Sequence, residues 1–156
     1  MTTSSLAYRQ NVGIVLLNDA GLILACERQD IPGAWQMPQG GIDEGEAPLT
    51  AALRELEEET GITAATVIRP TRTTFKYDFP RPKPSDLWRG QEQIWYALHF
   101  IGNEDDIDVR HAAHTEFSQH AWISPAEMLR RIVDFKRPVY ENVFLDFSDI
   151  LSPPIG

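Results

Sequence analysis

The sequence contains a single cysteine, Cys26, among 156 residues, so no internal disulfide bond is possible. It also contains no apolar run near the roughly 20 residues that a membrane-spanning helix needs, since runs such as residues 12–17 have the length of strands. The first residues lack the basic start and the apolar stretch of a signal peptide. Together these absences predict a cytoplasmic protein without a membrane partner, because free thiols persist in a reducing compartment.

Basic residues are also few. The 14 Lys and Arg residues face 23 Asp and Glu residues, which gives a formal net charge of −9. This balance argues against a general nucleic-acid coat protein, whose affinity comes from many contacts between cations and phosphates. Residues 69–89 are the exception, with six basic residues and two acids; six minus two is +4, which leaves −13 for the remainder. The segment is either a place where an anion is handled or a solvated loop.

The length and the ordinary apolar content predict one globular domain over residues 1–156. Apolar patterning predicts strands over residues 11–18, 22–27, 35–37, 64–71, 73–79, 93–101 and 117–123, with a break at residues 38–41. Helical spacing predicts a helix over residues 48–60, with an apolar stripe of Leu49, Ala52, Leu53 and Leu56. Further helices are expected to begin after Ser124 and to cover residues 137–150. The interspersed pattern is typical of an α/β fold.

The helix over residues 48–60 is rich in glutamate. At 100° per residue, Glu55, Glu58 and Glu59 lie on one side of it, away from the leucine stripe. Three carboxylates this close repel one another unless a cation neutralises them, and Mg²⁺ characteristically binds a few carboxylates together with phosphates. The alternative is an acidic face that is merely solvated.

The surroundings of the helix favour the metal site. The pair Gly40-Gly41 allows close approach of the backbone, and Arg54 is placed to pair with Glu46. From Gly40 to Ile62 the residues follow the spacing G-x5-E-x7-R-E-L-x-E-E-x-G-I. On this motif the chain resembles the Nudix hydrolases.

The resemblance implies a Nudix-type α/β/α sandwich with a mixed β-sheet and a catalytic loop–helix–loop. It implies hydrolysis of nucleoside diphosphates linked to another group, with Mg²⁺ or Mn²⁺ and more than one ion per site. Carried over by position, the metal-binding and catalytic carboxylates are Glu55, Glu58 and Glu59, and the Gly40 carbonyl is an additional ligand. The structural residues of the motif are Gly41, Glu46, Arg54 and Gly61.

The flanks of the motif resemble the bacterial RNA pyrophosphohydrolases and their relatives, the dinucleoside polyphosphate hydrolases. The matching segments are residues 8–15, 35–42, 115–117, 121–122 and 134–140. This likeness implies that Glu116 is a fourth metal-binding and catalytic carboxylate. It also implies a substrate-binding set of Arg9, Arg28, Phe135, Lys136 and Arg137, in which Phe135 stacks on a base.

The sequence therefore predicts a monomeric RNA pyrophosphohydrolase that converts the 5′-triphosphate of transcripts to a monophosphate and so initiates RNA decay. The same site is expected to accept dinucleoside polyphosphates. One alternative is a hydrolase whose own substrate is a dinucleoside polyphosphate, ADP-ribose or a free nucleotide. Another is a Nudix-fold binding module without catalysis, although the intact set of four glutamates argues against it.

Overall fold

The computed structural model describes residues 6–80, 87–110 and 117–151. The strands are β1 (Tyr8–Leu17), β2 (Ile23–Arg28), β3 (Trp35–Gln36), β4 (Gln39–Gly41), β5 (Ala65–Pro70), β6 (Phe75–Asp78), β7 (Gly90–Phe100) and β8 (Phe117–Ile123). The helices are α1 (Pro48–Thr60), the short 3₁₀ turn η2 (Glu104–Asp106), α2 (Pro125–Arg131), α3 (Arg137–Asp146) and α4 (Ser148–Leu151). Across these ranges, no helix has both the length and the apolar content to cross a membrane.

The strands of the described residues form one mixed sheet with the order β3-β2-β1-β7-β5. Its centre is the parallel pair β1 and β7, which runs in register from Tyr8 opposite Gly90 to Leu17 opposite His99. The other pairs are antiparallel, and strands β4, β6 and β8 join β1, β7 and β2 respectively. The mixed sheet agrees with the predicted α/β class.

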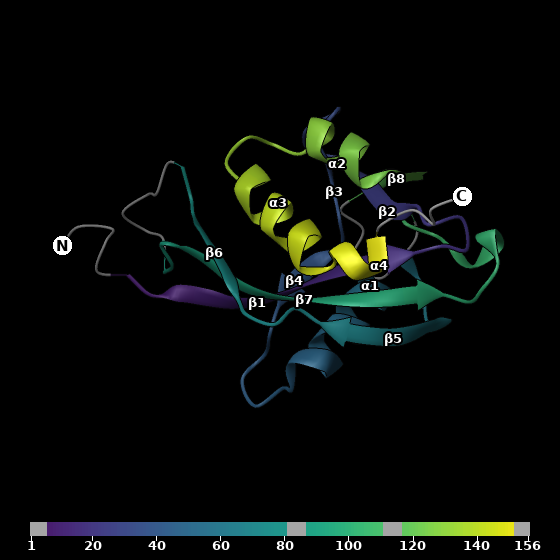
Figure 1. Cartoon of the computed structure of the whole chain (residues 1–156). Coiled ribbons are helices and arrows are strands. Elements are labelled where there is room, and N and C mark those ends of the chain that lie inside the picture. Colours follow the sequence, from purple (N-terminus) through teal and green to yellow (C-terminus); the bar gives the residue numbers. More distant parts are fainter. Residues whose placement is uncertain (1–5, 81–86, 111–116, 152–156) are drawn as a thin grey trace.

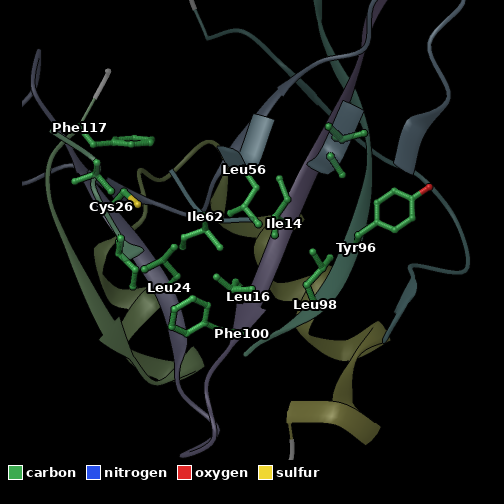
Figure 2. Packing of buried hydrophobic residues seen from close by; sticks show 14 of the residues in the cluster. Ile14, Leu16, Leu24, Cys26, Leu56, Ile62, Tyr96, Leu98, Phe100 and Phe117 are labelled. Carbon is green, nitrogen blue, oxygen red and sulfur yellow. The ribbon is translucent and has the colours of Figure 1, made fainter. Parts of the chain in front are cut away.

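Helices cover both faces of the sheet: α1 lies on one face, and α2 and α3 lie on the other (Figure 1). Strand β1 shows how the sequence creates two cores, because successive side chains of a strand point to opposite faces. Ile14 and Leu16 pack with Leu56 of α1, as Figure 2 shows, whereas Val15 and Leu17 pack with the α2–α3 side. The three layers confirm the predicted α/β/α sandwich.

Helix α1 begins and ends as predicted. Pro48 occupies its first turn, and Gly61 ends it with a φ of 77°, while its N–H donates to Glu57 O at 2.8 Å. The predicted apolar stripe was wrong in one member, because Leu53 is 41% exposed. The buried face turns instead through Ala51, Ala52, Leu56, Glu59 and Thr60.

Two other expectations were wrong in detail. Residues 39–41 do not break the sheet but form β4, whose Gly40 and Gly41 pair with Val12 and Asn11 of β1. The last helix is not continuous over residues 137–150, because it ends at Asp146 and a new turn starts at Ser148. Between them the buried Phe147 departs from helical geometry, which interrupts the helix. The predicted start of α2 is confirmed, since the Ser124 side chain accepts a hydrogen bond from Glu127 N at 3.1 Å.

Candidate active site

The carboxylates of α1 face a pocket of about 440 Å³ between this helix and strand β4. Glu55, Glu58 and Glu59 all line it, together with Gly40 and Gly41. The structure therefore brings the predicted metal-binding residues of the described chain to one place. One feature differs from the expectation that all three glutamates lie away from the apolar stripe: Glu59 is only 4% exposed, because it lies on the buried side of the helix.

Arg54 is the centre of the ion pairs at this pocket. Its Nε and Nη2 donate to the two carboxylate oxygens of Glu46, both at 2.8 Å, and Nη2 also donates to Gly41 O at 2.9 Å. Its Nη1 donates to Glu55 at 2.8 Å and to Glu58 at 3.1 Å. One guanidinium thus fastens the loop that carries Glu46 to the helix and reduces repulsion between two of the carboxylates. The predicted pairing of Arg54 with Glu46 is confirmed.

The charges of this ion-pair group shift the pKa values of both partners. Hydrogen bonds from Arg54, reinforced by the backbone N–H of Asp43, lower the pKa of Glu46 to about 2. Hydrogen bonds to Glu46 and then Glu55 raise the pKa of Arg54 above its usual value. Both groups are therefore charged throughout the physiological range.

Strand β4 contacts two of the glutamates on α1, Glu59 and Glu55. The backbone N–H of Gln39 donates to Glu59 Oε2 at 3.1 Å. At the next residue the strand packs closely on the helix, because a Cβ on Gly40 would lie 2.0 Å from the Glu55 carboxyl carbon. A larger residue at this position would therefore displace the Glu55 carboxylate from its place in the pocket.

The donor set of the pocket fits a hard divalent cation. It consists of carboxylate and backbone oxygens, which Mg²⁺ and Mn²⁺ prefer over nitrogen or sulfur. Among the described residues, however, no three acidic, histidine or cysteine side chains already converge closely enough to hold an ion. Glu116, the fourth predicted carboxylate, lies outside the described residues.

Arg9 and Gln91 enter the same pocket from the central strands, where they are neighbours in the β1–β7 register. The Arg9 side chain lies against Gly41, since a Cβ there would approach its Nη2 to 2.2 Å, and this side chain makes no hydrogen bond or ion pair with any described residue. Gln91 is 9% exposed, and its buried Oε1 has no hydrogen-bond partner among the residues that the structure describes. A free cation beside an unpartnered amide is an arrangement suited to a polar, anionic ligand.

The predicted aromatic residue Phe135 is 39% exposed and therefore not a core residue. Its ring lies 5.8 Å from that of Tyr77, and the Lys136 ammonium lies within 6.0 Å of both rings. Lys136 is itself 6% exposed and donates to Gln36 Oε1 at 3.5 Å. This group forms a second surface whose exposed member is an aromatic face.

Tyr77 connects this surface to the carboxylate pocket. Burial raises the pKa of its hydroxyl to about 12, whereas the neighbouring Gln39 amide and then the charges of Arg28 and Arg9 act to lower it. Tyr77 is therefore protonated at neutral pH and lies near Arg28 and Arg9, two of the three arginines that were predicted to bind substrate. Sequence reasoning missed Tyr77 and Gln91, because the pairing that places Gln91 between Arg9 and Tyr77 is non-local and leaves no signal in the sequence.

The remaining predicted substrate residues are less closely gathered. Arg28 forms a two-point ion pair with Asp30, at 2.9 and 2.6 Å. Arg137 is exposed at the first position of α3.

The basic segment of residues 69–89 is partly engaged in structural ion pairs. Arg69 binds Asp146 at 2.9 Å and Asp149 at 2.8 Å, and Arg89 binds Asp78 at 2.8 Å. Two of its other cations, Arg81 and Lys83, lie outside the described residues. For Arg69 and Arg89 the contacts support a structural role.

The comparison with known families agrees with the geometry. Residues 7–143 match the model of the NUDIX domain. The chain belongs to the Nudix hydrolase family, and the site is that of a Nudix pyrophosphohydrolase.

Relatives cover nearly the whole chain. It is 47% identical over 156 residues to an RNA pyrophosphohydrolase of Erythrobacter litoralis, covering 94% of each chain. It is 41% identical to Nudix hydrolase 25 of Arabidopsis thaliana, covering 93% of this chain and 89% of that one. Among solved structures, the dihydroneopterin triphosphate pyrophosphohydrolase of E. coli shares the fold with a TM-score of 0.69 and 22% identity, over 90% of this chain and 99% of that one.

Proposed function

We propose that this protein is a metal-dependent RNA pyrophosphohydrolase, which removes pyrophosphate from the 5′-triphosphate end of RNA. The observation that carries the proposal is the pocket that the glutamates of α1 share with Arg9, whose side chain has no hydrogen bond or ion pair to any described residue. The names of relatives that are 43–48% identical over nearly the full chain support the choice of RNA.

The residues divide the work in the following way. Glu55, Glu58 and Glu59, with Glu116 and the Gly40 carbonyl, would hold Mg²⁺ or Mn²⁺, with more than one ion per site. When bound, such ions neutralise phosphate charge and lower the pKa of a bound water that attacks phosphorus. Arg54 holds the loop that carries Glu46 against the helix, so that the carboxylates remain fixed while the substrate binds.

The substrate end is assigned to the second surface together with the three predicted arginines, of which Arg9 lies in the carboxylate pocket. Arg9, Arg28, Lys136 and Arg137 supply cations for the 5′ phosphates, and the exposed face of Phe135 supplies a platform for a base. Each such stacking contact contributes roughly 1–3 kcal/mol where it forms. Because the chain is acidic overall, these cations would attract the phosphates locally against a negative net charge.

A comparison of two substrates tests the proposal. We expect the protein to release pyrophosphate and leave a 5′-monophosphate on triphosphorylated RNA, with a kcat/KM higher than that for diadenosine polyphosphate. The Glu59→Gln protein serves as the control for contaminating activity. A reversed ranking of kcat/KM would instead assign the protein as a dinucleoside polyphosphate hydrolase, and no turnover of either would contradict the proposal.

A further inference from the structure

A hydrogen-bonded row of three side chains, Trp95, Gln93 and Gln39, with Asn11 as a branch, runs to the pocket, and none of the four belongs to the motif of residues 40–62. Trp95 Nε1 donates to Gln93 Oε1 at 3.2 Å, and Gln93 Nε2 donates to Gln39 Oε1 at 3.1 Å. Gln93 Nε2 also donates to Asn11 Oδ1 at 2.8 Å. Trp95, Gln93 and Asn11 are each at most 1% exposed, so water does not substitute for the bonds among these three, whereas the bond to Gln39 is partly buried.

The indole of Trp95 determines how the side-chain amide of Gln93 is oriented. An indole N–H can only donate, so Gln93 must turn its carbonyl to Trp95 and its two amide hydrogens to Asn11 and Gln39. The Trp95 ring reaches this position because Gly13, its partner in the β1–β7 register, has no side chain. A Cβ on Gly13 would lie 2.3 Å from the ring.

The row ends at the residue that contacts a predicted metal ligand. Gln39 belongs to β4, a strand of only three residues, and its backbone N–H donates to Glu59 Oε2 at 3.1 Å. The Gln39 side chain is thus anchored to the central strand β7, while its backbone holds Glu59. Glu58, in contrast, is bonded to Arg54.

We propose that Gln93 is a positioning residue for catalysis, which fixes Gln39 and through it the carboxylate of Glu59. The inference rests on the proposed function only in taking Glu59 as a metal ligand. Residues that orient metal ligands without touching the metal typically change affinity or activity by about 10–100-fold when they are replaced.

The first test is structural and needs no metal or substrate. Gln93→Met keeps the length of the side chain but removes all three hydrogen bonds. We expect hydrogen exchange of the Gln39 backbone amide, followed by NMR, to become about 10-fold faster, because the anchor of β4 is lost. The matched control is Thr71→Val, which removes the buried hydroxyl that accepts from Trp95 N and leaves the row intact. Unchanged exchange at Gln39, or equal acceleration in both variants, would overturn the inference.

The second test uses Mn²⁺ binding, measured by electron paramagnetic resonance. We expect Gln93→Met to weaken Mn²⁺ binding about 10–100-fold, and Trp95→Phe to weaken it less, since only the first bond is lost. In a Glu59→Gln background Gln93→Met should have no further effect, whereas in a Glu58→Gln background its full effect should remain. Should Gln93→Met fail to fold, Trp95→Phe carries the same comparison.

The outcomes separate this inference from the proposed function. A penalty that persists in the Glu59→Gln background, or a wild-type protein that binds no Mn²⁺, would overturn the positioning role. The Gln39 exchange and Mn²⁺ binding results could be as expected while the wild-type protein shows no preference for RNA over diadenosine polyphosphate. That outcome would overturn the RNA assignment alone.

Discussion

Arg54 and Glu46 form a two-point ion pair in which Nε and Nη2 each donate to a separate carboxylate oxygen at 2.8 Å. The two residues are eight positions apart, one on α1 and one on the loop before it, so the pair closes the loop onto the helix. Because the same guanidinium also contacts Glu55 and Glu58, loop closure and carboxylate placement depend on one side chain.

The first prediction concerns the geometry of this guanidinium. Arg54→Lys keeps the charge but cannot reproduce the fork that spans Glu46, Gly41 O and the helix carboxylates. We expect kcat to fall at least about 10-fold, as is typical when a residue that orients metal ligands is changed. Steady-state kinetics at saturating Mg²⁺ measures this. A lysine variant with wild-type kcat would show that charge alone suffices.

The second prediction concerns pH. The folded-state pKa of Glu46 is about 2, below its unfolded value of about 4.5, so its ion pair stabilises the fold above the unfolded pKa. That contribution is lost as the pH falls from about 4.5 through about 2. In Glu46→Gln the melting temperature should therefore fall less over this range than in the wild type. Equal falls in melting temperature in the wild type and in Glu46→Gln would contradict a stabilising role for the Glu46 ion pair.

The third prediction concerns the carboxylates. Glu58→Gln and Glu59→Gln each keep the side-chain size but remove a negative charge from the pocket. We expect activity to fall by orders of magnitude in both, while the fold survives. Kinetics at saturating Mg²⁺ measures the loss of activity, and circular dichroism checks that the fold is kept. A near-normal kcat in Glu59→Gln would show that Glu59 is not a metal-binding residue.

The fourth prediction separates the roles of two phenylalanines. Phe135→Ala should raise KM for RNA and leave stability nearly unchanged, because the ring is 39% exposed. Phe147→Ala is the matched control, since Phe147 is fully buried and its loss should cost about 3–5 kcal/mol of unfolding free energy. Melting curves and kinetics on the same samples give both readouts. A large stability loss in Phe135→Ala would make it a packing residue.

The sequence was sufficient wherever local rules determine structure. The bounds of α1, the left-handed Gly61 and the cap at Ser124 follow from residue types at fixed offsets, and the structure confirms them. The pairing of Arg54 with Glu46 was also predictable, because the motif fixes both positions.

The sequence was insufficient where pairing is non-local. In the sequence, β4 looks like the end of a strand, since Gly40 and Gly41 have no strand propensity. Its pairing with β1 is what creates the strand. The contribution of β7 to the site was likewise hidden, because Gln91 and Gln93 become relevant only once this strand lies beside β1. The roles of the predicted substrate residues, the single domain and the monomeric state remain predictions.

The parallel pair of β1 and β7 has a consequence for how the protein folds. The paired strands lie far apart in the sequence, as the contact between Gln10 and Glu92 across 82 residues shows, and the helix with the glutamates lies between them. Closing so long a loop costs chain entropy before any contact between the strands is gained, which slows folding. On the ribosome, the site therefore cannot be completed until β7 has emerged, so a shorter nascent chain carries the whole motif of α1 and yet has no finished pocket.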